Sequence, residues 1–154
     1  MNPRTNTRTD ITITMIDRSP TIVLFGSAKS PPGSADYQLA FDLGRELADK
    51  GYRIANGGYG GIMQASAQGA SQAGGHTIGV TCSAFGRGGP NEWIDEEIRT
   101  ANLNERLNRL VELGDAYIVL PGGTGTLLEL ALVWESINKG FLPQRPIICI
   151  APYW

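Results

Sequence analysis

The sequence predicts an α/β protein with a doubly wound parallel sheet and helices on both faces of that sheet. Three observations support this prediction. Short apolar runs alternate with helical patterns from Thr21 onward, the 20 glycines gather where the apolar runs end, and the connections between successive runs are long enough for a helix. We expect such connections to be right-handed crossovers.

Length and composition indicate one domain with a core of ordinary size. The 154 residues are 42% hydrophobic and 18% charged, which is unlike a disordered chain. We expect a flexible segment over residues 1–19 and the domain over residues 20–154, although the alternation in Ile11–Ile16 would also suit an added edge strand. A net charge of -2 and a pI near 5.4 disfavour duplex nucleic acid and anionic membranes as partners.

The first half of the domain predicts three strands and two helices. Leu39, Leu43 and Leu47 recur every fourth residue and predict a helix, which Ser34 begins as a cap and Gly51 ends. In order, we expect a strand at Thr21–Phe25, a helix from Ser34 to Lys50, a strand at Tyr52–Ala55, a helix from Gly60 to Ala73 and a strand at Thr77–Thr81.

The second half continues the alternation and ends on a strand. In order, we expect a loop at Cys82–Pro90, a short helix at Asn91–Arg99, a helix at Asn102–Leu113, a strand at Ala116–Leu120, a turn at Pro121–Gly125, a helix to Lys139 and a strand at Pro146–Ile150. No helix pattern follows that last strand before Trp154. We expect either a partner chain or further residues of a longer protein to cover this edge.

The sequence also predicts where the protein resides and how its cysteines are used. The N-terminus has no basic segment before an apolar stretch, and the longest apolar runs are far shorter than the roughly 20 residues of a membrane span. We therefore expect a cytoplasmic protein. Cys82 and Cys149 lie near apolar strand-like runs without a CxxC motif, which favours buried reduced thiols over a disulfide or metal pair.

A glycine-rich turn, Pro121-Gly122-Gly123-Thr124-Gly125-Thr126-Leu-Leu-Glu129, lies between a predicted buried strand and a helix. Backbone N–H groups converge in such a turn and at the helix N-terminus, where the helix dipole favours an anion. The threonine hydroxyls would add donors to a phosphate. The spacing equally suits a capping box, in which Glu129 only satisfies a backbone donor.

A second glycine cluster, Asn56-Gly57-Gly58-Tyr59-Gly60-Gly61, follows the second predicted strand. The carboxyl ends of parallel strands form one rim, so both clusters face the crevice where such sheets bind ligands. Close helix packing alone would also explain these glycines. The chain lacks GxxxxGK[ST] and GxGxxG, and the second strand ends in Asn56 instead of an acid, which favours a mononucleotide or a sugar phosphate over ATP or NAD.

Several other residues are candidates for a site or for a structural role. On the helix 102–113, Arg106 lies at the edge of the leucine stripe and can reach a cleft, or it forms an ordinary ion pair, whereas Arg109 faces water. We expect His76 to be structural, and we expect neither a metal nor a cofactor. The remaining assignments are that Trp93 and Trp134 pack, that none of the three lysines lies in the cleft, and that the loop Ser83–Pro90 with Arg87 is either a lid or a plain connection.

The turn at Pro121–Glu129 resembles the PGGxGTxxE signature of the LONELY GUY family, proteins long misassigned as lysine decarboxylases. The resemblance extends over Thr21–Ile150 through Phe25-Gly26-Ser27, Gly57-Gly58-Tyr-Gly60-Gly61-Ile-Met63, Ala73-Gly-Gly-His-Thr-Ile-Gly79 and Asn104-Glu-Arg106. It implies a Rossmann-like, nucleotide-binding fold and a homodimer or higher homo-oligomer. The family commonly has a basic residue where this chain has Leu107, and C-terminal helices that are absent here.

The resemblance further implies hydrolysis of the N-glycosidic bond of a nucleoside 5′-monophosphate, a cytokinin ribotide or AMP, with Arg106 and Glu129 catalytic and Gly122–Thr126 holding the phosphate. The chemistry is consistent with this, because an ionised carboxylate stabilises the positive charge that develops on the ribose. Arg106 would clamp the phosphate or the ribose hydroxyls. Two alternatives stay open: a protein that holds a nucleotide or molybdenum cofactor without hydrolysis, and an inactive relative.

Overall fold

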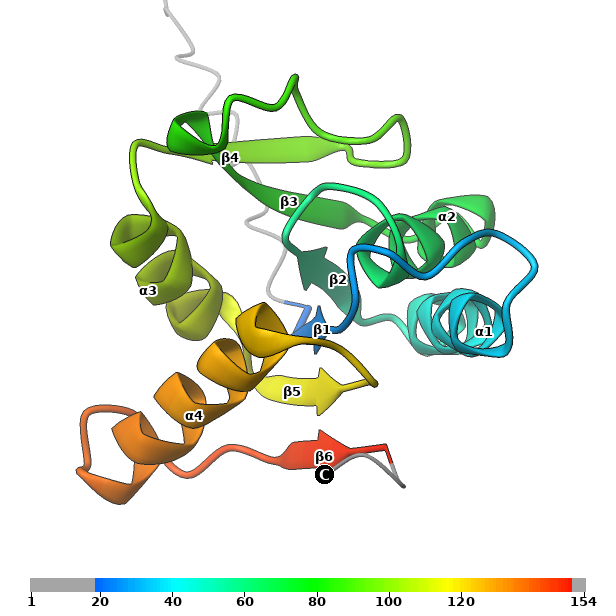
Figure 1. The fold of residues 1–154 in the computed structure, drawn as a ribbon. Helices are drawn as coiled ribbons and strands as arrows, with labels where there is room; N and C mark the ends of the chain where they lie inside the picture. Colours follow the sequence, from blue (N-terminus) through cyan, green and yellow to red (C-terminus); the bar gives the residue numbers. More distant parts are fainter. Residues whose placement is uncertain (1–18, 151–154) are drawn as a thin grey trace, which may run out of the picture.

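The computed structural model describes residues 19–150, which form a six-stranded parallel sheet with four α-helices (Figure 1). The predicted edge strand at Ile11–Ile16 lies outside the described residues. The strand order is β4-β3-β2-β1-β5-β6, and each neighbouring pair is parallel. The elements are β1 (Thr21–Phe25), α1 (Ala35–Asp49), β2 (Arg53–Asn56), α2 (Ile62–Gln72), β3 (Thr77–Cys82), a 3-10 turn (Ser83–Phe85), β4 (Glu96–Thr100), α3 (Leu103–Leu113), β5 (Ala116–Val119), α4 (Thr124–Asn138) and β6 (Ile147–Cys149).

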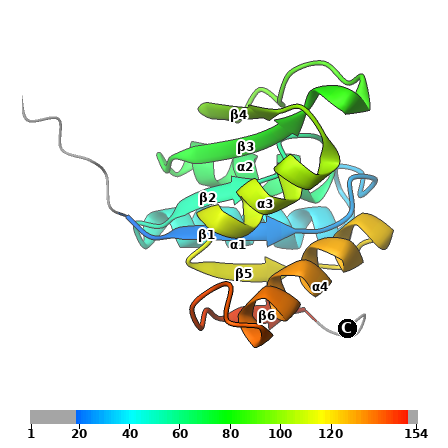
Figure 2. The same cartoon turned by 90° about the vertical axis from the view of Figure 1, so that its left-hand side faces the viewer.

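Helices cover both faces of the sheet, which confirms the doubly wound architecture. α1 and α2 lie on one face, and α3 and α4 lie on the other (Figures 1 and 2). Alternate side chains of β1 point to opposite faces, as the pleat of a strand requires. Val23 and Phe25 therefore join the core beneath α3 and α4, while Ile22 and Leu24 join the core beneath α1 and α2. Parallel strands bring their carboxyl ends to one rim of this sheet.

The predicted short helix at Asn91–Arg99 is wrong, because its second half is the edge strand β4. β4 pairs with β3 over five residues, with Thr81 opposite Arg99. The Asp95 carboxylate accepts a 2.9 Å hydrogen bond from the Thr77 N–H, and the Thr77 hydroxyl donates to the Trp93 carbonyl. These long-range hydrogen bonds stabilise an extended chain whose local pattern suggested a helix.

Packing also differs from prediction at three places. The Ser34 cap is confirmed, since its hydroxyl accepts from the Tyr37 N–H, but α1 buries Tyr37, Ala40 and Gly44 and leaves Leu39 37% exposed. Cys82 is buried as predicted, whereas Cys149 is exposed because β6 is an edge strand. Trp134 on α4 is 60% exposed and does not pack in the core.

Within residues 19–150, no helix combines the length and the apolar character that a bilayer span requires.

Candidate active site

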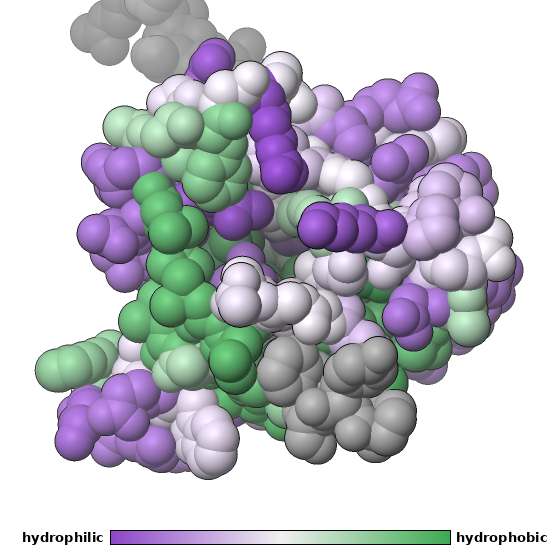
Figure 3. Space-filling model, viewed as in Figure 1, coloured by the Kyte–Doolittle hydropathy of each residue, from purple (hydrophilic) through white to green (hydrophobic). Residues whose placement is uncertain are grey.

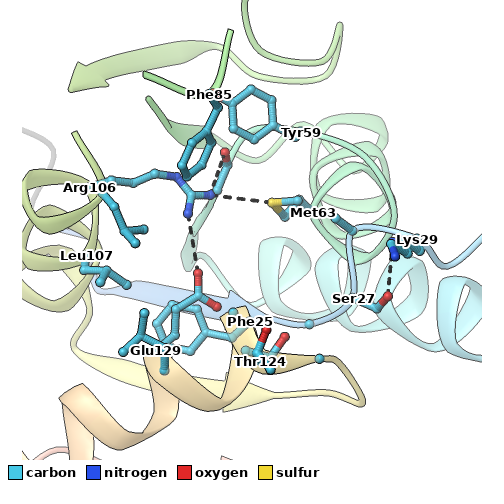
Figure 4. Close-up of a pocket in the computed structure, with 18 of the residues that line it drawn as sticks. Phe25, Ser27, Lys29, Tyr59, Met63, Phe85, Arg106, Leu107, Thr124 and Glu129 are labelled. Carbon is cyan, nitrogen blue, oxygen red and sulfur yellow. Dashed lines mark hydrogen bonds and ion pairs between the residues drawn. The ribbon is translucent and has the colours of Figure 1, made fainter. Parts of the chain in front are cut away.

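A cavity of about 620 Å³ lies at the carboxyl-terminal rim of the sheet, where β1, β2, α3 and α4 meet (Figure 4). The two glycine-rich turns that the sequence predicted to share a crevice both contribute to its wall, at Gly57 and at Gly123–Thr126. The lining comprises Leu24, Phe25, Gly26, Ser27, Ala28, Lys29, Gly57, Tyr59, Met63, Phe85, Arg87, Leu103, Arg106, Leu107, Gly123, Thr124, Gly125, Thr126, Leu128 and Glu129.

Most, but not all, of the predicted site residues line this cavity. Those that do are Gly26, Ser27, Gly57, Met63, Gly123, Thr124, Gly125, Thr126, Arg106 and Glu129. The others, Gly58, Gly60, Gly61, Pro121 and Gly122, do not line the cavity but belong to the turns that form its wall. Gly61, for example, has a positive φ of 64° and would place a Cβ 2.2 Å from the Ser27 carbonyl oxygen. Glycine is therefore required there for the β1 and β2 turns to touch.

The turn before α4 presents free backbone donors to the cavity. α4 begins at Thr124. Its N-cap is Gly123, so no side chain of the cap residue accepts a hydrogen bond from the first N–H groups of the helix. The first N–H groups of a helix lack intrahelical partners, so those at this end are available to an anion. Thr124 is exposed and lines the cavity, and the Ser27 N–H donates to the Pro121 carbonyl, which ties the β1 turn to this one.

The capping-box interpretation of Thr126 and Glu129 is wrong. The helix begins three residues earlier than a Thr126 cap requires, and Thr126 is buried within its first turn. The side chain of Glu129 points across the cavity toward α3 (Figure 4). Glu129 is therefore available to a ligand in the same cavity as the donors of the turn.

Arg106 is held in the cavity wall by protein groups on three sides. Its side chain is only 8% exposed and lines the cavity. Nε donates to the Val80 carbonyl at 2.8 Å, Nη2 donates to the Gly57 carbonyl at 3.1 Å, and Nη1 lies 3.6 Å from Glu129 Oε1. A Cβ on Gly57 would lie 1.8 Å from Arg106 Nη2, so the glycine leaves room for the guanidinium.

The carboxylate of Glu129 is nearly buried and has an unusual proton affinity. Burial raises the pKa of Glu129 to about 7, and the opposing effect of Arg106 is smaller. Burial likewise lowers the pKa of Arg106, against the attraction of Glu129. A carboxyl group with this pKa exchanges protons near neutral pH, which is the property of a catalytic acid or base.

Aromatic residues that the sequence did not single out form the wall opposite α4. The Tyr59 and Phe85 rings lie 6.2 Å apart, with the guanidinium carbon of Arg106 5.7 Å and 5.5 Å from their centroids (Figure 4). The Tyr59 hydroxyl donates to the Cys82 carbonyl and accepts from the Cys82 N–H, which fixes the ring against the end of β3. The place of Tyr59 inside the glycine cluster could have identified it from the sequence as a residue of the site. No sequence pattern points to Phe85.

Several residues considered from sequence lie elsewhere. His76 pairs with Glu96 at 3.1 Å at the other end of β3, and Arg109 forms an exposed ion pair with Glu112. The expectation that no lysine reaches the cleft is wrong, because Lys29 lines the cavity. Across residues 19–150, no three His, Cys, Asp or Glu side chains cluster as a metal site would require.

The chain is similar in sequence to a known family and to several known proteins. Residues 19–149 match the SLOG cluster4 family. A cytokinin riboside 5′-monophosphate phosphoribohydrolase of Mycobacterium tuberculosis is 35% identical over 128 residues, which are 82% of this chain and 68% of that protein. The corresponding rice enzyme LOG is 35% identical over 130 residues, and this chain covers 52% of its length.

Solved structures share the fold. The molybdenum cofactor binding protein of Rippkaea orientalis superposes with a TM-score of 0.70 at 31% identity, over 87% of this chain and 77% of that one. The Rossmann-like architecture implied by the sequence resemblance is thereby confirmed. The chain belongs to the SLOG cluster4 family and is a relative of the LOG proteins, as its resemblance to the LONELY GUY signature predicted.

Proposed function

We propose that the protein hydrolyses the N-glycosidic bond of a nucleoside 5′-monophosphate and releases the free base and ribose 5-phosphate. The observation that carries this proposal is the position of Glu129, a nearly buried carboxylate that shares one cavity with the free N–H groups at the start of α4. The related phosphoribohydrolases of Mycobacterium tuberculosis and rice support it.

The phosphate is proposed to bind at the N-terminus of α4. Gly123, Thr124 and Gly125 line the cavity there, with Ser27 and Lys29 nearby on the β1 turn. Backbone donors, a hydroxyl and a cation suit a dianionic group. Binding energy from the phosphate would then position the reacting carbon of the sugar.

Glu129 is proposed to act at C1′. It lies about one and a half turns beyond the start of α4, at roughly 1.5 Å of rise per residue, so a ribose can bridge the two sites. Breaking the C1′–N bond develops positive charge on the sugar, which an ionised carboxylate stabilises. The same carboxylate can accept a proton from the attacking water.

Arg106 is proposed to position Glu129. Nε and Nη2 already donate hydrogen bonds to backbone carbonyls, so the guanidinium has few N–H groups left for a bidentate clamp on phosphate. The earlier expectation of an arginine clamp is therefore replaced by a role in holding the carboxylate. Its positive charge also keeps Glu129 from becoming still harder to ionise.

The proposal is tested by incubating the protein with AMP and with isopentenyladenosine 5′-monophosphate and following free base by chromatography. Both nucleotides are useful because exposed Leu103 and Leu128 line the cavity and suit an apolar substituent on the base. We expect release of base and a loss of about 100-fold or more in Glu129→Gln. No base from either nucleotide, or an unaffected Glu129→Gln variant, would falsify the proposal.

A second candidate is a protein that holds a nucleotide or molybdenum cofactor without hydrolysis, which the structural likeness to the Rippkaea orientalis protein favours. The donors at α4 fit the phosphate of such a ligand as well as that of a substrate. A carrier does not require Glu129, whereas hydrolysis uses its carboxylate. Calorimetry that shows tight nucleotide binding without turnover would favour the carrier.

We also propose that two copies associate through the outer face of α4. Leu127 and Trp134 are exposed there, while Leu130 and Val133 of the same helix are buried, so α4 carries apolar residues on both sides. Apolar surface extends over the α3 and α4 side of the molecule (Figure 3). A helix that is apolar on all sides needs a partner on its outer face. The cytoplasmic location stays a prediction.

A further inference from the structure

The cavity has a second end, away from the start of α4. Figure 4 shows Thr124 and Glu129 on one side of Arg106 and the rings of Tyr59 and Phe85 on the other. A phosphate at α4 and a C1′ beside Glu129 leave this aromatic end for the base. Aromatic rings are common platforms for nucleobases.

Arg87 stands at this aromatic end. Its guanidinium carbon lies 5.2 Å from the centroid of the Tyr59 ring and 6.0 Å from that of Phe85, and the residue lines the cavity. It makes no ion pair with any carboxylate in the described part of the chain. Contacts of an exposed cation with aromatic rings contribute only about 0.5–1 kcal/mol, so a ligand can replace them.

The loop that bears Arg87 is fixed at its ends and open at its tip. The side-chain amide of Asn91 donates to the Tyr59 carbonyl at 2.8 Å and thereby fastens the far end of the loop to the β2 turn. At the tip, Gly86, Gly88 and Gly89 surround Arg87, and no atom outside the adjacent residues lies within 4 Å of where their side chains would be. Arg87 can therefore move toward a ligand by giving up only its contacts with the Tyr59 and Phe85 rings.

The two arginines of the cavity differ in what remains free. Arg106 is buried and bound to Val80, Gly57 and Glu129, whereas Arg87 is bound to no acceptor in residues 19–150. The positive charge of Arg87 nevertheless acts inside the cavity, since it contributes to the lowered pKa of Arg106. Arg87 is thus the cation that a ligand at the aromatic end would meet.

We propose that Arg87 binds the departing base and stabilises the negative charge that develops on it. This inference rests on the proposed function. In the reaction, water adds its oxygen to C1′, the electron pair of the C1′–N bond moves to the base nitrogen, and one proton of the water ends on that nitrogen. A cation beside the base lowers the energy of the state in which the electron pair has arrived and the proton has not.

The test compares AMP with its N7-methylated derivative in wild type and in Arg87→Ala. The N7-methylated base already carries a positive charge and leaves as a neutral molecule, so no negative charge develops on it. We expect Arg87→Ala to lower kcat/KM at least about tenfold on AMP and to change it less than about threefold on the N7-methylated nucleotide. Arg87→Lys keeps the charge and is expected to lose less than Arg87→Ala on AMP.

Arg109→Ala is the matched control, because Arg109 is an exposed arginine outside the cavity and should leave both nucleotides unaffected. Equal losses of Arg87→Ala on both nucleotides, or equal losses in Arg87→Lys and Arg87→Ala, would overturn the inference. So would a comparable weakening of ribose 5-phosphate binding, measured by calorimetry, because that ligand has no base and the residue would then be a phosphate ligand. If wild type cleaves neither nucleotide, the proposed function fails as well, and the two failures are thereby distinguished.

Discussion

At the scale of single residues, the protein depends on the protonation of Glu129. Its carboxyl group lies 3.6 Å from Arg106 Nη1 and is 13% exposed. The attraction of one arginine does not offset the loss of water around the carboxylate, so the pKa rises from 4.5 to about 7. The protonation of this side chain therefore changes in the range of pH where most enzymes work.

The proposed role of Glu129 predicts the pH dependence of hydrolysis. If the ionised carboxylate stabilises the transition state, kcat/KM rises with pH and levels off above an apparent pKa of about 7, because kcat/KM reports the free protein. The measurement is a pH profile of kcat/KM for AMP between pH 5 and pH 9. A profile that is flat across pH 7 contradicts the assignment.

The same pKa predicts a pH dependence of stability. The folded state holds the Glu129 proton more tightly than the unfolded state, so the contribution of Glu129 to the free energy of unfolding falls as pH rises from 4.5 to about 7. At about 1.4 kcal/mol per pKa unit, the fall is on the order of 3 kcal/mol. Urea unfolding of wild type and Glu129→Gln at pH 5 and pH 8 measures it.

In that experiment, Glu129→Gln is expected to gain stability relative to wild type at pH 8 compared with pH 5. Glu135→Gln provides the control, because Glu135 is exposed on the same helix and pairs only with Lys139. The same change in the free energy of unfolding between pH 5 and pH 8 for wild type and Glu129→Gln would rule out the raised pKa.

At the scale of elements, the β2 turn and α3 pack closely because Gly57 has no side chain. Gly57 Cα lies so close to Arg106 that an added Cβ would be 1.8 Å from Nη2 and 2.5 Å from the sulfur of Met63. The turn and the arginine are therefore one structural unit, although 49 residues separate them.

Gly57→Ala should displace Arg106 and with it Glu129. We expect kcat/KM to fall about 10- to 100-fold, because small misplacements of a catalytic group are costly. Gly60→Ala is the matched variant in the same turn, since its Cβ would lie 3.5 Å from the Ala28 carbonyl oxygen, an ordinary contact. Activity is measured on AMP for both, and comparable losses in the two variants would contradict the role of Gly57.

The connection between α3 and β5 depends on the hydroxyl of Tyr117. The single proton of this fully buried hydroxyl is shared between the Val111 and Gly114 carbonyls, and its oxygen accepts from Arg145 Nη1 at 3.2 Å. Burial raises the pKa of Tyr117, and Arg145 opposes that effect.

Tyr117→Phe removes the buried hydroxyl that pairs with the Gly114 carbonyl and with Arg145 Nη1, and it is expected to lower the free energy of unfolding by about 1–3 kcal/mol. Urea unfolding measures the loss. Tyr52→Phe serves as the control, because the Tyr52 hydroxyl makes no hydrogen bond within residues 19–150. An unchanged unfolding midpoint in Tyr117→Phe would show that the hydrogen bonds of the Tyr117 hydroxyl contribute nothing to the free energy of unfolding.

At the scale of the whole molecule, α4 and the segment after it expose large apolar residues. Leu127 and Trp134 lie along α4, and Phe141 follows α4. A surface of this kind is typical of a contact between chains.

The proposed dimer predicts a mass in solution of about twice the 16.5 kDa of one chain. Trp134→Glu is expected to shift the protein toward the single chain, because it places a charge in the apolar contact. Light scattering after size exclusion measures both. Gln38→Glu on α1, on the opposite face of the sheet, should leave the mass unchanged, and a single-chain mass for wild type would contradict the proposal.

Local pattern was enough to predict much of this molecule. The alternation of apolar runs and helices predicted the layered parallel sheet, and the positions of the glycine clusters predicted that two turns meet at one rim. The leucine stripe of α3 placed Arg106 at the edge of a cleft. These features follow from periodicity and from the geometry of parallel strands, which act within a few residues.

Other features were decided by contacts between distant segments. β4 is a strand because β3 and the Asp95–Thr77 hydrogen bonds hold it extended, and Glu129 is a partner of Arg106 instead of a cap because α4 begins at Thr124. The sharing of Tyr59 and Phe85 by Arg106 and Arg87 likewise has no local signature. The sequence alone therefore determined the alternation of strands and helices and the meeting of the two glycine-rich turns at one rim. Only the tertiary structure decided that β4 is a strand and which side chains pair, because both depend on atoms that come together after the chain has folded.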